Sequence, residues 1–98
     1  MERGGYVYIM TNKHHTTLYT GVTSELQVRI NQHKSKEFPN SFTSKYNCDK
    51  LVYYCDFPTI EEAIAEEKRI KGGSRQDKID LINKINSKWE DLSGEVEE

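Results

Sequence analysis

One acidic residue interrupts an apolar helix face. The segment of residues 59–71 has apolar residues at helical spacing, and Glu67 falls in the middle of the face that they form. These apolar residues are Ile60, Ala63, Ile64 and Ile70. A carboxylate that faces a protein core is costly unless it is paired, hydrogen-bonded or bound to a metal ion. The spacing alone therefore leaves two interpretations of Glu67 open: a structural ion pair, with Arg29 as one candidate partner, or a metal ligand.

Arg29 and His33 are a second combination that could do chemistry. They lie four residues apart in a predicted helix, so both can reach one point in space. A guanidinium is always charged and offers fixed donors to phosphate oxygens, although by spacing alone such a pair is more often an ordinary surface feature. Tyr8 and Tyr19 are typical strand residues, and Gly21 marks either a bulge or a place where a substrate approaches the backbone.

The elements that must position these residues follow the order strand, strand, helix, strand, helix, helix. The predicted strands are residues 5–10, 17–22 and 51–57, by their β-branched and aromatic content. The predicted helices are residues 24–36 and 59–71, which begin with capping-box patterns, and residues 74–85, which Ser74 can cap. The short connection between the first two strands predicts an antiparallel hairpin, and residues 37–50 are predicted to form a loop. This order indicates an α+β fold.

Length and composition restrict the class of protein. Ninety-eight residues fit one domain, and nine Tyr and Phe residues argue against disorder despite a charged fraction of 31%. No apolar run approaches membrane-spanning length and no secretion leader follows Met1, so we expect a cytoplasmic protein without a membrane partner. The two cysteines, Cys48 and Cys55, are expected to be reduced thiols.

The net charge of −2 is unevenly distributed. Residues 90–98 hold five acids and no bases, and we expect a frayed acidic tail there, after a single domain of residues 1–89. Without that tail, 14 bases stand against 11 acids. Five bases gather within eleven residues: Lys68, Arg69, Lys71, Arg75 and Lys78. Such a patch can attract phosphate, although charge alone favours a solvated helix face.

Taken together, these residues resemble the GIY-YIG nuclease superfamily, in particular its short stand-alone bacterial members. Residues 6–8 and 19–21 correspond to the two motifs that name the family, and the stretch 61–71 is similar to its glutamate-bearing helix. Residues 85–92 resemble its closing segment, so the resemblance spans roughly residues 5–92. Three positions depart from the motifs: Tyr6 replaces a glycine, and Val7 and Thr20 replace isoleucines.

The resemblance implies a small three-stranded antiparallel sheet flanked by helices, and metal-dependent hydrolysis of DNA phosphodiester bonds in repair, recombination or processing. Glu67 would be the single protein ligand of one Mg²⁺ or Mn²⁺ ion. Tyr8 and Tyr19 would line the site, one of them deprotonating or orienting the attacking water. Arg29 would hold the scissile phosphate, assisted by His33, which could instead assist Tyr8. The residues expected to contact nucleic acid are Gly21, Lys45, Lys68, Lys71, Arg75 and Asn86.

Two other functions fit the same sequence. One is a catalytically silent nucleic-acid-binding module of the same fold, for which the basic patch would suffice. The other is a protein-interaction domain that uses the acidic tail or exposed tyrosines. Metal-dependent plasmid nicking distinguishes the nuclease from both, and salt-sensitive DNA binding without nicking identifies the silent module.

Overall fold

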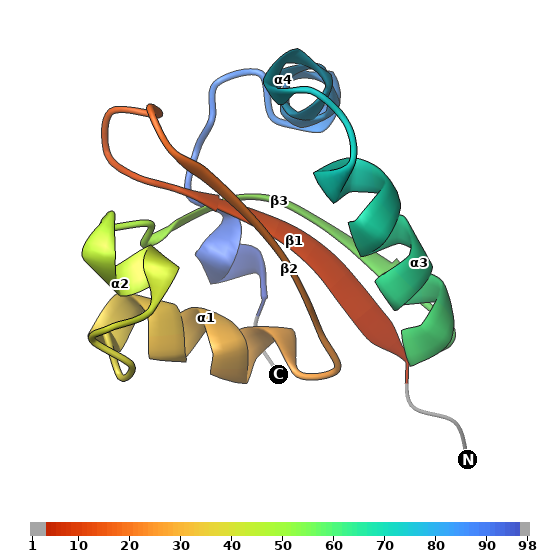
Figure 1. Cartoon of the computed structure of the whole chain (residues 1–98), viewed down its shortest axis with the longest axis horizontal. Helices are drawn as coiled ribbons and strands as arrows, with labels where there is room; N and C mark the ends of the chain where they lie inside the picture. Colours follow the sequence, from red (N-terminus) through yellow and green to blue (C-terminus); the bar gives the residue numbers. More distant parts are fainter. Residues whose placement is uncertain (1–3, 97–98) are drawn as a thin grey trace.

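The structure is a computed structural model and describes residues 4–96. Three antiparallel strands form one sheet in the order β2-β1-β3. The strands are β1 (Gly5–Thr11), β2 (Leu18–Thr23) and β3 (Lys50–Phe57), and the helices are α1 (Leu26–Ser35), α2 (Phe42–Lys45), α3 (Ile60–Lys71) and α4 (Arg75–Ile85), followed by the 3-10 helix η1 (Leu92–Glu95). Helices α1 and α2 cover one face of the sheet, and α3 and α4 cover the other (Figure 1). The predicted α+β fold and the hairpin are confirmed.

Strand β1 lies at the centre and its residues alternate between two cores. Val7 and Ile9 pack with the buried residues of α3 and α4, whereas Tyr8 and Met10 pack with those of α1. Tyr6 lies on the same face of β1 as Tyr8 and Met10. Because the side chains of a strand alternate, the central strand divides the chain into two thin cores, one on each face of the sheet.

A bulge in β3 breaks this alternation. The pairing of β1 with β3 matches Ile9 to Tyr53 and Met10 to Leu51, so it skips Val52. As a result Val52 and Tyr53 both join the core beneath α3 and α4, and Leu51 joins the core beneath α1. The extra residue of a bulge lies outside the regular ladder, which leaves its backbone groups free for other partners.

The helix starts were predicted correctly at two of three places. The hydroxyls of Thr59 and Ser74 each accept a hydrogen bond from a backbone N–H three residues on, and Ser74 forms a full capping box with Asp77. The capping box expected at Ser24 is wrong, because α1 begins at Leu26 without a side-chain cap. Strand β2 extends to Thr23, whose hydroxyl accepts from the Glu25 backbone at 3.0 Å and shapes the turn instead.

Two segments predicted to be irregular are ordered elements. Residues 37–50 contain α2, capped by Ser41, whose hydroxyl accepts from the backbone N–H of Ser44. The frayed tail expected from residue 90 is wrong for residues 90–96, because η1 packs against β3. There the Tyr54 hydroxyl donates to Glu95 at 3.1 Å. Residues 97 and 98 lie outside the described residues. Between residues 4 and 96, no helix has the length and apolar character needed to cross a membrane.

Candidate active site

The phenol ring of Tyr8 lies across the backbone of Gly21. The two residues are partners in the register of β1 and β2, and Tyr8 is fully buried. A Cβ atom at Gly21 would come within 2.5 Å of both Cζ and the hydroxyl oxygen of Tyr8. Gly21 is therefore required for the position of the Tyr8 ring, which explains why a glycine occupies this position. Its expected contact with nucleic acid stays a prediction.

Helix α1 supplies both partners of the Tyr8 hydroxyl. His33 of α1 approaches it with Nε2 at 3.0 Å, and the side chain of Arg29, one turn earlier, also hydrogen-bonds to it. The other ring nitrogen of His33, Nδ1, lies 2.8 Å from the hydroxyl oxygen of Thr43 on α2. The predicted convergence of Arg29 and His33 on one point is thus seen, and that point is the Tyr8 hydroxyl.

The direction of these hydrogen bonds follows from what each group can donate. Arg29 has donors only, so it donates to the Tyr8 oxygen, and the phenol proton needs a different acceptor. His33 Nε2 is the acceptor within reach, so the proton of the neutral ring is on Nδ1 and is donated to Thr43. Thr43 in turn lies 3.3 Å from the Ser41 hydroxyl, to which it can donate. A continuous chain of donors and acceptors therefore runs from Arg29 to Ser41.

The protonation states agree with this chain. Burial and the neighbouring Tyr19 raise the pKa of Tyr8 above its ordinary value, and the Arg29 charge offsets only part of that effect. Burial and then Arg29 lower the pKa of His33 below 6.5, so the imidazole is neutral at pH 7. A neutral imidazole beside a protonated phenol is the combination in which the phenol proton can be taken up by His33.

An open cavity of about 190 Å³ adjoins this chain. Its lining residues come from β2, α1, α2 and the segment before α2: Tyr19, Arg29, Gln32, His33, Phe38, Ser41, Phe42 and Thr43. The ring centroid of Tyr19 lies 6.3 Å from that of Tyr8 and 5.7 Å from that of His33. Three of the residues singled out from the sequence (Tyr19, Arg29 and His33) therefore line one concave place, and the fully buried Tyr8 is hydrogen-bonded to His33.

Glu67 lies on α3, which covers the other face of the sheet. Its side chain on α3 is 12% exposed and forms an ion pair with Lys71 Nζ at 2.7 Å. Arg29, the partner considered from the sequence, bonds to Tyr8 instead. The Glu67 charge is close enough to contribute to the raised pKa of Tyr8. Since Ile64 of the expected apolar face is exposed, Glu67 lies at the edge of that face rather than in its middle.

The donor set fits a divalent ion held by one carboxylate. Among residues 4–96 there is no group of three or more His, Cys, Asp and Glu side chains that could hold a metal ion. Mg²⁺, however, keeps several waters and is commonly bound by one or two carboxylates together with substrate phosphate. Glu67 offers such a carboxylate, and Lys71, which is half exposed, can move away from it.

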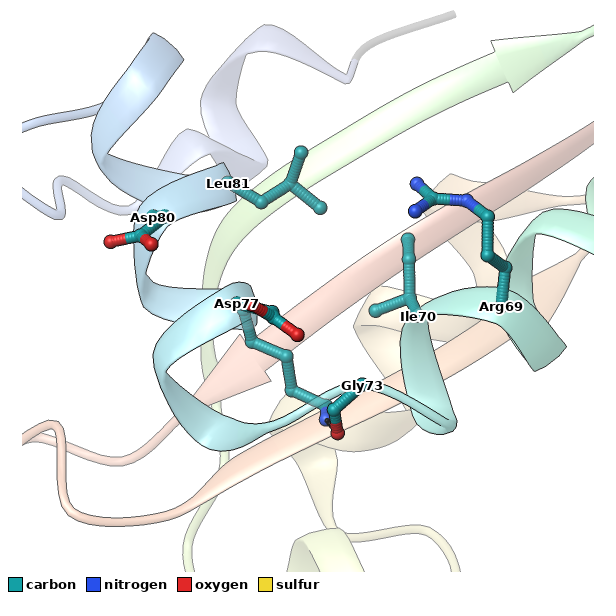
Figure 2. Close-up of a pocket in the computed structure, with 7 residues that line it drawn as sticks. Arg69, Ile70, Gly73, Asp77, Asp80 and Leu81 are labelled. Atoms are coloured by element: carbon teal, nitrogen blue, oxygen red, sulfur yellow. Dashed lines mark hydrogen bonds between the residues drawn. The ribbon is translucent and has the colours of Figure 1, made fainter.

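The basic patch is less continuous than its sequence suggested. Lys45 and Lys68 are exposed, but Lys71 pairs with Glu67, and Arg75 donates to the carbonyl of His15 at 3.1 Å. Two further bases, Arg69 and Lys78, line a separate cavity of about 360 Å³ between α3 and α4 (Figure 2). Asp77 and Asp80 line it too, and it contains none of the predicted site residues.

Asn86 has a structural role. It is 8% exposed and ends α4, and its amide donates to the carbonyls of Val52 at 3.0 Å and Glu90 at 2.9 Å. Its carbonyl oxygen accepts from the Glu90 backbone at 3.0 Å. Both amide hydrogens are thus used, which argues against the nucleic-acid contact expected for this residue. Instead Asn86 ties α4 to the backbone of the skipped residue in β3.

Thr43 and Phe42 were missed from the sequence. Both belong to α2, a single turn within a segment predicted to be a loop. A four-residue helix has no apolar period, and a threonine that hydrogen-bonds to a distant histidine leaves no local pattern. The one available signal was Ser41, a good helix cap followed by residues without Gly or Pro.

The class of this protein follows from the fold, the clustered tyrosines and the match of the chain to a known family. The sequence profile described as the GIY-YIG catalytic domain matches residues 4–86, which is most of the chain. The chain therefore belongs to the GIY-YIG family, which places it in a nuclease superfamily.

Its relatives are small bacterial proteins. A UPF0213 protein of Clostridium perfringens is 36% identical over 95 residues, covering 93% of this chain and 96% of the relative. One from Syntrophus aciditrophicus is 32% identical, covering 79% and 87%. The solution NMR structure of a UPF0213 protein from Bacillus halodurans is similar, with a TM-score of 0.57 and 31% identity over 91% of this chain and 93% of that one.

Proposed function

We propose that this protein is an endonuclease that hydrolyses DNA phosphodiester bonds with the help of a divalent metal ion, in the repair, recombination or processing of DNA. The observation that carries the proposal is the Tyr8 hydroxyl, which is hydrogen-bonded to both Arg29 and His33 and lies within the electrostatic reach of Glu67. A structural tyrosine needs only that its buried hydroxyl be hydrogen-bonded, whereas a cation, a neutral imidazole and a carboxylate around one phenol are the groups that proton transfer beside a phosphate would use.

Tyr8 and His33 would move the proton in this reaction. Because the Tyr8 hydroxyl is fully buried in the free protein, this step requires that substrate binding open it to the attacking water. The water then gives a proton to the Tyr8 oxygen as Tyr8 passes its own proton to Nε2 of His33, and the resulting imidazolium still donates its Nδ1 proton to Thr43. A phenol with a pKa of ~10 is a poor base alone, so the acceptor behind it is essential. As the water oxygen bonds to phosphorus, the bond to the leaving oxygen breaks, and that oxygen takes a proton from solvent.

Arg29 and Tyr19 would bind and orient the phosphate. The guanidinium of Arg29 lines the cavity and is always charged, so it can hold the non-bridging oxygens whose negative charge grows during attack. The ring of Tyr19 lines the same cavity beside His33 and restricts where the water can lie. Glu67 would hold the divalent ion, which when bound neutralises charge on the phosphate and the leaving oxygen.

The deciding experiment is supercoiled-plasmid nicking with Mg²⁺ or Mn²⁺, and with EDTA as the metal-free control. The variants Glu67→Ala and Arg29→Ala are each expected to lose at least a hundredfold in rate with unchanged circular dichroism. Ile85→Ala, on the exposed surface of α4, is the matched control and is expected to retain full activity. Equal nicking by the wild type and both site variants would refute the site.

One observation favours the second candidate, a catalytically silent nucleic-acid-binding module. The Lys71 ammonium forms an ion pair with the Glu67 carboxylate, with Nζ 2.7 Å from Oε2. This ion pair competes with a metal ion for the carboxylate. Lys71→Met removes the competitor, so a nuclease would need less Mg²⁺ for half-maximal nicking. If neither protein nicks at any metal concentration but both bind DNA with a steep salt dependence, the silent module is the correct function.

A further inference from the structure

A row of aromatic rings leads from the candidate site to the surface. The ring of Tyr19 stacks on that of Phe42 with centroids 5.9 Å apart and an interplanar angle of 30°. Phe42 in turn lies 4.7 Å from Tyr46, the residue that ends α2. Phe42 is 45% and Tyr46 is 46% exposed, so the outer two rings of this aromatic row are open to solvent.

Exposed aromatic surface is concentrated at this one place. Of the large hydrophobic residues that are exposed among residues 4–96, the aromatic ones are Phe38, Phe42 and Tyr46, all within nine residues of the sequence. Single exposed apolar residues are ordinary on protein surfaces, but a contiguous aromatic group marks a binding site. The two outer rings belong to neither hydrophobic core, so they contribute nothing to core packing.

The surrounding charges indicate what the row binds. Phe38 and Phe42 line the same cavity of about 190 Å³ as Arg29, and Lys45 lies exposed on α2 between Phe42 and Tyr46. Flat apolar rings interleaved with cations match a nucleotide strand, whose bases stack on the rings while the cations contact its phosphates. A purely apolar peptide would offer no negative charge to Arg29 and Lys45, so it fits this surface less well than a nucleotide strand does.

The bound nucleotide must have a free base. In a duplex both faces of a base are covered by its neighbours, so it has no face to offer to Phe42 or Tyr46. A phosphate and its own base are separated by one sugar, and Arg29 and Phe42 line one cavity. A strand whose phosphate meets Arg29 therefore brings an unpaired base over the aromatic row.

We propose that Phe42 and Tyr46 form a stacking platform for an unpaired base next to the phosphate held by Arg29, so that the preferred substrate is DNA that is single-stranded at the cleavage position. The choice of substrate rests on the proposed nuclease function. Binding of unpaired bases by the platform does not, which allows the two to be tested separately.

The test measures binding in a protein that does not cut. The Glu67→Ala variant, with and without Phe42→Leu and Tyr46→Leu, is titrated by fluorescence anisotropy with a single-stranded oligonucleotide and with the blunt duplex of the same sequence. The leucines should weaken single-strand binding about tenfold and change duplex binding less than twofold, because leucine keeps apolar bulk but not a flat ring. Ile85→Ala in the same background is the control for an exposed apolar residue elsewhere and should change neither.

A second signal reports stacking directly. An oligonucleotide with 2-aminopurine should lose fluorescence on binding to the parent and to Phe42→Trp, and should keep it with the leucine variants. Equal loss of binding on both DNA forms, or no loss on either, overturns the platform. If the single leucine variants melt at the parent temperature, failure to fold is excluded. Absence of nicking by the wild type alongside a clear single-strand preference would overturn the nuclease and support the platform.

Discussion

The burial of Tyr8 and the hydrogen bonds of its hydroxyl have opposite consequences for proton transfer. Burial raises its pKa, which makes the phenol harder to ionise, yet its hydroxyl is hydrogen-bonded to a cation and to a neutral imidazole. A phenol in this setting cannot act as a stable anion, but it can pass a proton on in the same step in which it receives one. The ability of the site to transfer a proton therefore depends on the tautomer of His33, and Thr43 sets that tautomer.

We predict that Thr43→Val will impair nicking without displacing His33. Valine has nearly the shape of threonine but cannot accept the Nδ1 proton, so the proton moves to Nε2 and blocks uptake from Tyr8. An unpaired buried donor costs about 1–3 kcal/mol, which corresponds to a rate loss of roughly fivefold to 150-fold. The rate is measured from pH 5 to 9. Wild-type activity should fall as the pH drops below 6.5 through the lowered pKa of His33.

The control is Thr43→Ser, which keeps the hydroxyl and should restore most of the rate. A valine variant with the wild-type rate and pH profile would show that Thr43 does not act through His33. DNA binding by the Thr43→Val protein should be unchanged, because Thr43 is buried and its effect is confined to the proton-transfer step.

We also predict that Gly21→Ala will destabilise the fold and disturb Tyr8. The added Cβ would lie 2.5 Å from Tyr8 atoms, so the buried ring must shift, and overpacking of this kind costs about 1–3 kcal/mol. Urea unfolding measures the change, with Gly94→Ala as the control, since nothing lies within 4 Å of a Cβ there. In a Tyr8→Ala background the cost should largely disappear. Equal costs in both backgrounds would mean that the clash is not with Tyr8.

At the scale of elements, the sequence predicted the strands and helices that leave a local pattern in it. The strands were predicted from their β-branched and aromatic content and the long helices from apolar spacing and caps, and the two caps at Thr59 and Ser74 are confirmed. Helix α2, helix η1 and the β3 bulge were not, because each depends on partners distant in sequence. The same limit applies to the site: resemblance predicted Arg29 and His33 together, but not Thr43 behind them.

The bulge and the end of α4 are one structural unit, which Asn86→Ala should disrupt. The change removes three hydrogen bonds and leaves the Val52 carbonyl without its Asn86 partner, so we expect about 2–3 kcal/mol of lost stability. Urea unfolding again provides the measurement. Asn83→Ala on the same helix, where the exposed side chain accepts a hydrogen bond from the Trp89 indole nitrogen, should cost less than half as much. Similar costs for both variants would contradict the role given to Asn86.

For the molecule as a whole, one carboxylate joins elements that are distant in sequence. Asp91 accepts hydrogen bonds from Lys34 of α1 at 2.7 Å, from the backbone of Leu51 in β3 at 3.2 Å and from Ser93 of η1. Burial acts to raise the pKa of Asp91, but these hydrogen bonds outweigh it and hold the pKa below its ordinary value. Protonation of this one group should therefore loosen α1, β3 and the C-terminal segment together.

The pH dependence of stability follows in sign from this shift. Because the pKa of Asp91 is lower in the folded protein than in the unfolded chain, where it is ~3.9, its contribution is fully present above that value. It is lost as the pH falls through the folded pKa. We predict that Asp91→Asn lowers the urea midpoint at pH 7 and that the difference shrinks as the pH falls below the ordinary range of a carboxyl group, so that the two proteins converge in acid. The difference at pH 7 should be modest and should shrink in high salt, since over a third of the carboxylate is exposed. A difference that stays constant from pH 7 to 2.5 would mean that Asp91 acts through its shape and not through its charge.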